Sequence, residues 1–108
     1  MLNKEDLSKI DVRVGTIIDA SVNRKTRIPA YKMKIDFGEL GIKNSSAQIT
    51  ELYTPDTLVG RQVICVFNLT PIRVSEVKSE VLVLGIPTDK GVVLLSVDEK
   101  VDNGLKIS

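Results

Sequence analysis

Two groups of cationic side chains are the residues of this sequence best suited to binding chemistry. Five of the fifteen basic residues fall within eleven positions: Arg24, Lys25, Arg27, Lys32 and Lys34. No acidic residue occurs between Asp19 and Asp36, and Arg73 and Lys78 follow in a second polar segment. Ammonium and guanidinium groups bind phosphate oxygens, which indicates a polyanionic ligand such as a nucleic acid. The alternative is a solvated charged face that only keeps the protein soluble.

A second candidate is the polar segment from Lys43 to Gln48, which reads KNSSAQ. Buried polar groups without partners cost about 1–3 kcal/mol each, so this segment is poorly suited to a dry interior. In a strand, Lys43 and Ser45 share one face while Ser46 and Gln48 share the other. One face could line a groove with donors and acceptors for phosphate and ribose groups. An ordinary half-exposed strand is the alternative.

The third candidate is a long polar connection between two apolar runs, Val63–Phe67 and Val81–Leu84. Long loops on rigid strand scaffolds usually contact a ligand or partner. We therefore predict that this connection carries five further site residues: Asn68, Arg73, Lys78, Ser79 and Glu80. The acidic residues Glu76 and Glu80 reduce its positive charge.

Catalysis has little support in this sequence. Histidine is absent, which removes the commonest general base and the commonest metal ligand. Cys65 alternates with Val63 and Phe67, so we expect a buried thiol and not a nucleophile. No glycine-rich phosphate loop occurs, and the carboxylates are scattered. We predict a protein that is not an enzyme, with no cofactor and no metal.

Length and composition indicate one all-β domain. The 108 residues leave room for one core, and 43% of them are hydrophobic. Only four residues are aromatic, so Val, Ile and Leu must build the core, which favours strands. The net charge of +1 gives no overall field that would attract nucleic acid, so any such case rests on local clustering.

The cysteine content and the length of the apolar runs indicate where the protein is located. The single Cys65 rules out an internal disulfide and suits a reducing cytoplasm. The segment from Met1 to Asp6 is polar and acidic after its first two residues, which is unlike a signal peptide. The longest apolar run is far shorter than the roughly 20 residues of a membrane span. We expect a soluble, cytoplasmic protein without membrane contact.

The predicted elements have the order of a five-stranded oligonucleotide-binding (OB) barrel. A short helix begins at the N-cap Asn3, with acids in its first turn, and a second short helix begins at Thr54. The expected strands are Asp11–Val22, Tyr31–Phe37, Ile42–Ile49, Arg61–Phe67 and Val81–Ile86. Gly15 and the Ile17–Ile18 doublet predict a bulge in the first strand. In such a barrel, the loops after the first and fourth strands meet at one rim.

The C-terminal part is expected to add a hairpin-like extension of Gly91–Val97 and Leu105–Ile107. The single domain 1–108 then divides into an N-terminal helix (1–10), a barrel (11–86) and a dimerisation extension (87–108). Apolar residues of the first and last parts have no obvious partner within one chain. We predict that a two-fold homodimer buries them. They are Leu2, Leu7, Ile10, Val92, Val93, Leu94 and Leu95.

Several motifs together resemble the CsaA family of small bacterial and archaeal proteins. They are DVRVG from Asp11, DFG from Asp36, KxSSAQI from Lys43, NxxPxR from Asn68, KSEVLVLG from Lys78, and Asn103–Gly104. This family is related to tRNA-binding OB domains that are appended to methionyl-tRNA synthetases. The synthetase-linked relatives usually continue with Gly-Met after Ser-Glu, whereas this chain has Val81-Leu82. The resemblance implies a homodimer, tRNA binding at the barrel rim, and a chaperone role in protein export.

The prediction is a non-catalytic protein that binds structured RNA, most directly tRNA, by its backbone and shape. Scarce aromatic residues argue against recognition of single strands by stacking. The alternative is an export-related holdase that binds unfolded or precursor polypeptides. A third possibility is a factor that tethers synthetases, which no residue of the sequence specifically supports.

Overall fold

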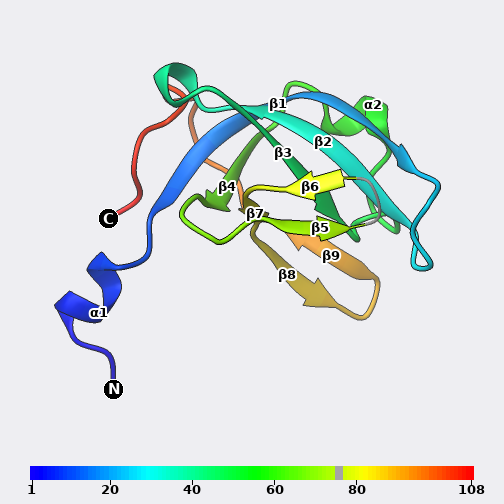
Figure 1. Cartoon of the computed structure of the whole chain (residues 1–108). Helices are drawn as coiled ribbons and strands as arrows, with labels where there is room; N and C mark the ends of the chain where they lie inside the picture. The colour runs from blue at the N-terminus through cyan, green and yellow to red at the C-terminus, as the bar shows by residue number, and fades with distance from the viewer. Residues whose placement is uncertain (75–76) are drawn as a thin grey trace.

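The computed structural model describes residues 1–74 and 77–108, and they form an all-β fold with few short helices (Figure 1). Its centre is a curled five-stranded antiparallel sheet of order β3-β2-β1-β4-β7. The strands are β1 (Val12–Asn23), β2 (Ala30–Asp36), β3 (Ile42–Ala47), β4 (Gln62–Val66) and β7 (Leu82–Val83). Within the described ranges, no helix is long and apolar enough to cross a membrane.

Strand β1 is long enough to pair with two neighbouring strands. Its first part pairs with β4 and its second part with β2, and the register to β2 shifts between Ile17 and Asp19. This confirms the bulge predicted near the Ile17–Ile18 doublet. At Gly15, a Cβ atom would lie 2.7 Å from the Ile35 side chain and 2.8 Å from the Phe37 ring. Only glycine leaves room for that contact, so Gly15 lets the sheet curl onto its own core.

The alternation predicted for the second strand is confirmed. Tyr31, Met33 and Ile35 are buried, while Lys32 and Lys34 are exposed on the outer face. The buried side chains pack in one core with residues of the neighbouring elements, among them Ile17, Phe37, Leu58, Val63 and Cys65. The outward lysines are therefore held on a rigid strand.

The helices are short and capped as predicted. In α1 (Lys4–Ser8), the Asn3 side chain accepts from the Asp6 backbone N–H at 3.0 Å. Helix α2 (Pro55–Leu58) is capped by Thr54 and buries Leu58. A 3₁₀ turn, η1 (Gly38–Leu40), joins β2 to β3. Helix α1 has no buried residue and extends away from the sheet (Figure 1).

The long connection after β4 is not a plain loop, which corrects the prediction. It contains β5 (Ile72–Val74) and β6 (Val77–Ser79), which pair in antiparallel register. The β-branched residues Ile72 and Val74, with Val77 after them, are the strand signal that the prediction of a loop did not use. Glu76, one of the two acids weighed in this connection, lies outside the described residues.

The strand expected at Val81–Ile86 is divided in two. Strand β7 pairs with β4, whereas β8 (Gly85–Thr88) leaves the sheet and pairs only with β9 (Gly91–Leu94). The C-terminal segment does not pair with β9 as predicted. It lies beside β1, where the Val14 backbone N–H donates to the Leu105 carbonyl at 3.1 Å and that of Ile107 to Val12 at 2.8 Å.

The two edges of the curled sheet are joined at β3. The Glu80 backbone N–H donates to the Asn44 carbonyl at 2.8 Å, and the Asn44 N–H donates to the Glu80 carboxylate at 3.0 Å. The buried Ser45 hydroxyl donates to the Val81 carbonyl at 2.9 Å. Because residues 79–81 lead directly into β7, these bonds draw the β3 and β7 edges together.

Candidate nucleic-acid interface

One pocket gathers cations from β2 and β6, which are far apart in the sequence. Its volume is about 450 Å³, and its lining residues are Asp19, Ser21, Lys32, Met33, Lys34, Asn44, Val77 and Lys78. We call this pocket the basic groove. Lys34 lies opposite Asp19 on β1 and opposite Asn44 on β3, which fixes its place on the outer face. Three lysines on rigid strands form a surface suited to phosphate groups.

Arg73 extends this positive surface on the β5–β6 hairpin. It is the cross-strand partner of Lys78, so the two side chains project from the same face, and both residues are exposed. Their placement next to the basic groove is favourable for a polyanionic ligand.

The cations of the β1–β2 turn stand apart from the groove lining. Arg24, Lys25 and Arg27 are exposed in that turn, and none of them lines the basic groove. The turn is held locally, since the Lys25 backbone N–H donates to the Asn23 side chain at 3.3 Å and the Thr26 hydroxyl to the Ile28 carbonyl at 2.6 Å. In Figure 1, β5 runs toward the same side of the view as this turn.

Several polar residues predicted for the site form hydrogen bonds within the fold. Ser45 is 1% exposed, so it cannot contact RNA, and its hydroxyl is used by the Val81 carbonyl. The Ser79 hydroxyl accepts from the Ser46 backbone N–H at 3.2 Å. These serines join β3 to the segment before β7, which corrects the ligand-facing role predicted for Ser45.

Asn68, Glu80 and Lys43 also have partners within the chain. The Asn68 side chain accepts from the Asp11 backbone N–H at 2.9 Å and donates to the Lys9 carbonyl at 2.7 Å. Glu80 bonds Asn44, and the Lys43 ammonium lies 5.7 Å from the centre of the Phe67 ring. Of the polar segment's remaining residues, Ser46 is half-buried and Gln48 is exposed, and neither lines the basic groove.

Two groove residues, Asp19 and Ser21, were not predicted from the sequence, whereas Asn44 belongs to the polar segment Lys43–Gln48 that was. Each lies opposite a lysine of β2, because Lys34 pairs with Asp19 and Asn44 while Lys32 pairs with Ser21. The bulge in β1 determines this register. A pattern of alternating residues read through the bulge without correction assigns Asp19 and Ser21 to the wrong face.

The one cysteine of the sequence lies in the core, outside the groove lining. Burial raises the pKa of the Cys65 thiol from 9.0 to about 12, so the thiol is protonated at neutral pH. Among the residues that the structure describes, no three acidic or cysteine side chains are grouped to hold a metal ion. The chemistry available at the groove is binding by charge and hydrogen bonds.

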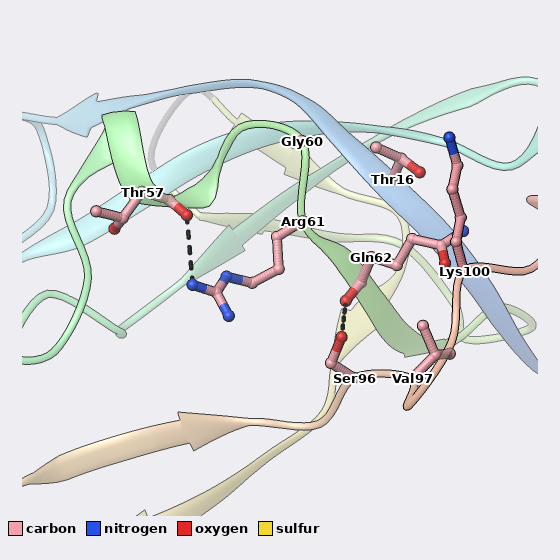
Figure 2. Close-up of a pocket in the computed structure, with 8 residues that line it drawn as sticks. All are labelled: Thr16, Thr57, Gly60, Arg61, Gln62, Ser96, Val97 and Lys100. Carbon is pink, nitrogen blue, oxygen red and sulfur yellow. Dashed lines mark hydrogen bonds between the residues drawn. The ribbon is translucent and has the colours of Figure 1, made fainter.

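A second pocket of about 490 Å³ lies between α2, β4 and the C-terminal segment (Figure 2). Its two cations do not converge, because Arg61 points toward Thr57 while Lys100 lies at the other end beside Thr16 (Figure 2). Its polar groups bond one another: the Arg61 guanidinium donates to the Thr57 carbonyl at 3.5 Å and the Ser96 hydroxyl to the Gln62 carbonyl at 2.6 Å. We regard this pocket as structural.

The residues predicted for a dimer interface differ in exposure. Leu2, Leu7 and Ile10 are exposed, as is Val93. Leu94 is 9% exposed and packs in the core, so it is not available to a partner, which corrects that prediction. Val92 packs against the same core, and Leu95 is half-buried. Strand alternation explains the split, because β9 directs Val93 outward and Leu94 inward.

Comparisons with known proteins agree on one family. The family described as "Putative tRNA binding domain" matches residues 12–106. The crystal structure of chaperone CsaA from Bacillus anthracis is 50% identical with a TM-score of 0.94, covering 100% of this chain and 99% of that one. The CsaA chaperone protein of Picrophilus torridus is 47% identical with a TM-score of 0.94, covering 100% of both chains.

Longer relatives share the same region. The methionine–tRNA ligase of Methanococcoides burtonii is 30% identical over 105 residues, which are 96% of this chain but 15% of the ligase. The chain thus spans a small part of the ligases that it matches.

Proposed function

This chain belongs to the CsaA family of tRNA-binding domain proteins, and from that membership we propose that it is a non-catalytic tRNA-binding protein. The single observation that carries the proposal is the basic groove, in which Lys32 and Lys34 of β2 meet Lys78 of β6. Phosphate groups of a folded RNA are the ligand that these cations fit. We expect this tRNA binding to take place in the cytoplasm.

We further infer that the curled sheet is an OB barrel within a single domain of residues 1–108. The five-strand order and the bonds between β3 and residues 79–81 support this inference. In OB folds, the outer face of the second and third strands and the loop between the fourth and fifth strands bind oligonucleotides. The three lysines of the basic groove lie on the corresponding parts of this chain, β2 and the β5–β6 hairpin.

Recognition is proposed to depend on the RNA backbone and its shape. Stacking on bases needs exposed aromatic rings. Tyr31 and Phe37 are buried, and Tyr53 and Phe67 are half-buried, so none of the four aromatic residues forms an exposed platform. The lysines and arginines remain as the principal contacts, and these act on phosphates of any sequence.

We also propose a two-fold homodimer. Leu2, Leu7 and Ile10 are exposed on and beside a helix that extends away from its own sheet (Figure 1). An apolar hollow of about 220 Å³, lined mainly by Val14, Ile64, Val97, Val101, Leu105 and Ile107, offers a surface of matching chemistry. A dimer would present two basic grooves to one folded RNA, which raises avidity without new contacts.

A tRNA titration across a salt series tests the proposed function. The three groove lysines, Lys32, Lys34 and Lys78, together with the neighbouring Arg73, should give a slope of log affinity against log salt of about −3, because each neutralised phosphate contributes about −0.7 to −0.9. Absence of tRNA binding at low salt would contradict the proposal.

A chaperone role is the second candidate. The solved structures at 50% and 47% identity are described as a chaperone, and this chain exposes an apolar cross-strand pair, Ile86 and Val93, on the β8–β9 hairpin. Holding unfolded or precursor polypeptides, as in protein export, would use such apolar surface and tolerate salt. Suppression of aggregation of an unrelated protein at high salt would support this candidate, and unchanged aggregation would exclude it.

A further inference from the structure

The basic groove contains one carboxylate that a purely phosphate-binding surface does not need. Asp19 lines the pocket together with Lys32, Lys34 and Lys78, and it is exposed. Within the described part of the chain, its carboxylate forms neither a hydrogen bond nor an ion pair. A negative charge in this position repels phosphate, so its presence calls for another partner on the ligand.

The register places Asp19 among the cations and not at the edge of the groove. It lies opposite Lys34, and Ser21, the next lining residue of β1, lies opposite Lys32. An ionised carboxylate can only accept hydrogen bonds, so a ligand group that contacts Asp19 must be a donor. In RNA, each ribose lies between the phosphates that the lysines attract, and its 2′-hydroxyl is a donor exposed in the shallow minor groove.

We propose that Asp19 accepts a hydrogen bond from a ribose 2′-hydroxyl of the bound RNA and thereby selects RNA over DNA. This inference rests on the proposed function, because it concerns the same groove. Lys32, Lys34 and Lys78 supply affinity through phosphates that RNA and DNA share. Asp19 supplies discrimination through the one donor that DNA lacks.

The test compares Asp19→Ala and Asp19→Asn with the wild type, using a tRNA and a DNA of the same sequence. Loss of a hydrogen bond to a charged group should weaken tRNA binding of Asp19→Ala about tenfold. DNA binding should stay equal or become tighter, because only a repulsive charge is lost. Asp19→Asn should fall between the wild type and Asp19→Ala for tRNA, since its amide oxygen still accepts. Asp89→Ala, on the exposed β8–β9 turn outside the groove, is the charge-matched control.

The outcomes separate this inference from the proposed function. Tighter binding of both tRNA and DNA by the two Asp19 variants would mean that the carboxylate only repels phosphate, which overturns the inference. Equal weakening for tRNA and DNA would point to a base amino group as the donor and would also overturn it. A wild-type protein that binds no tRNA would overturn the proposed function itself, before any variant is made.

Discussion

The Cys65 thiol shows how burial decides the chemistry of a residue. Its side chain is fully buried among apolar neighbours, where the thiolate would lose its hydration. Burial therefore raises its pKa from 9.0 to about 12. The thiol is a poor nucleophile in the folded state and acts as a small apolar core residue.

This pKa makes stability depend on pH. Because the folded state holds the proton more tightly than the unfolded state, the stabilisation is complete below pH 9.0 and is lost as pH rises toward about 12. Between these values, we predict that the free energy of unfolding falls by up to about 1.4 kcal/mol per pH unit more in the wild type than in Cys65→Ala. Urea denaturation at several alkaline pH values measures this, and parallel curves for the two proteins would contradict it.

Residue patterns predicted part of the candidate site and missed another part for definable reasons. Lys32 and Lys34 could be placed outward because Tyr31, Met33 and Ile35 alternate with them. Asp19 could not be placed, because its face depends on a bulge whose exact position is set by pairing with β2.

At the scale of elements, side-chain hydrogen bonds replace a regular ladder where β3 meets the segment before β7. Ser45, Ser79 and Glu80 supply these bonds. Their polarity, which indicated a ligand surface in the sequence, is used to close the sheet. Ser45 and Val81 are both buried, and the Val81 carbonyl accepts from the Ser45 hydroxyl at 2.9 Å and from the Ser79 hydroxyl at 3.3 Å.

Ser45→Ala should therefore destabilise the protein by about 1 kcal/mol, because it leaves the buried Val81 carbonyl with only the longer bond from the Ser79 hydroxyl. Its affinity for tRNA should not change while the protein remains folded. Ser46→Ala is the matched control: it removes a hydroxyl from the neighbouring position, where only the backbone N–H bonds Ser79. Chemical denaturation measures the first effect and a tRNA titration the second. Equal stability of the two variants would be the contrary result.

The five strands of the main sheet could be predicted, whereas the β5–β6 hairpin and the division at Leu84 could not. Strands such as β2 have a long alternation of apolar and polar residues, and burial of the apolar face in the core stabilises the strand. Strands β5 and β6 are three residues each, and each has a cation at its centre, Arg73 or Lys78. Whether Gly85 continues β7 or begins a new pair with β9 is decided by tertiary pairing, which a local pattern does not contain.

At the scale of the whole molecule, helix α1 packs little against the rest of its own chain. It contributes no buried residue, and a helix this short is unstable in water without packing. A second copy would give it a surface to pack on. The pairing of the C-terminal segment with β1 places the apolar Leu105 and Ile107 close to the start of the sheet.

We predict that the wild type sediments as a dimer and that Leu7→Glu shifts it to a monomer, because a charge replaces an apolar contact. Ser8→Glu adds the same charge to the same helix at a polar, exposed position and should leave the dimer intact. Sedimentation equilibrium distinguishes these states. A monomeric wild type at micromolar concentration would exclude the dimer.

The most direct measurement of the central claim is the salt dependence of tRNA binding by a variant that lacks the groove lysines. Lys32, Lys34 and Lys78 are replaced by alanine together, and Lys4, Lys90 and Lys100, which are exposed outside the groove, form the matched triple control. The groove variant should bind more weakly at low salt, and its slope should flatten by about 2–3, since each lost phosphate contact removes almost one unit. The control should keep the wild-type slope. A groove variant with the wild-type slope would contradict the claim that tRNA is bound there.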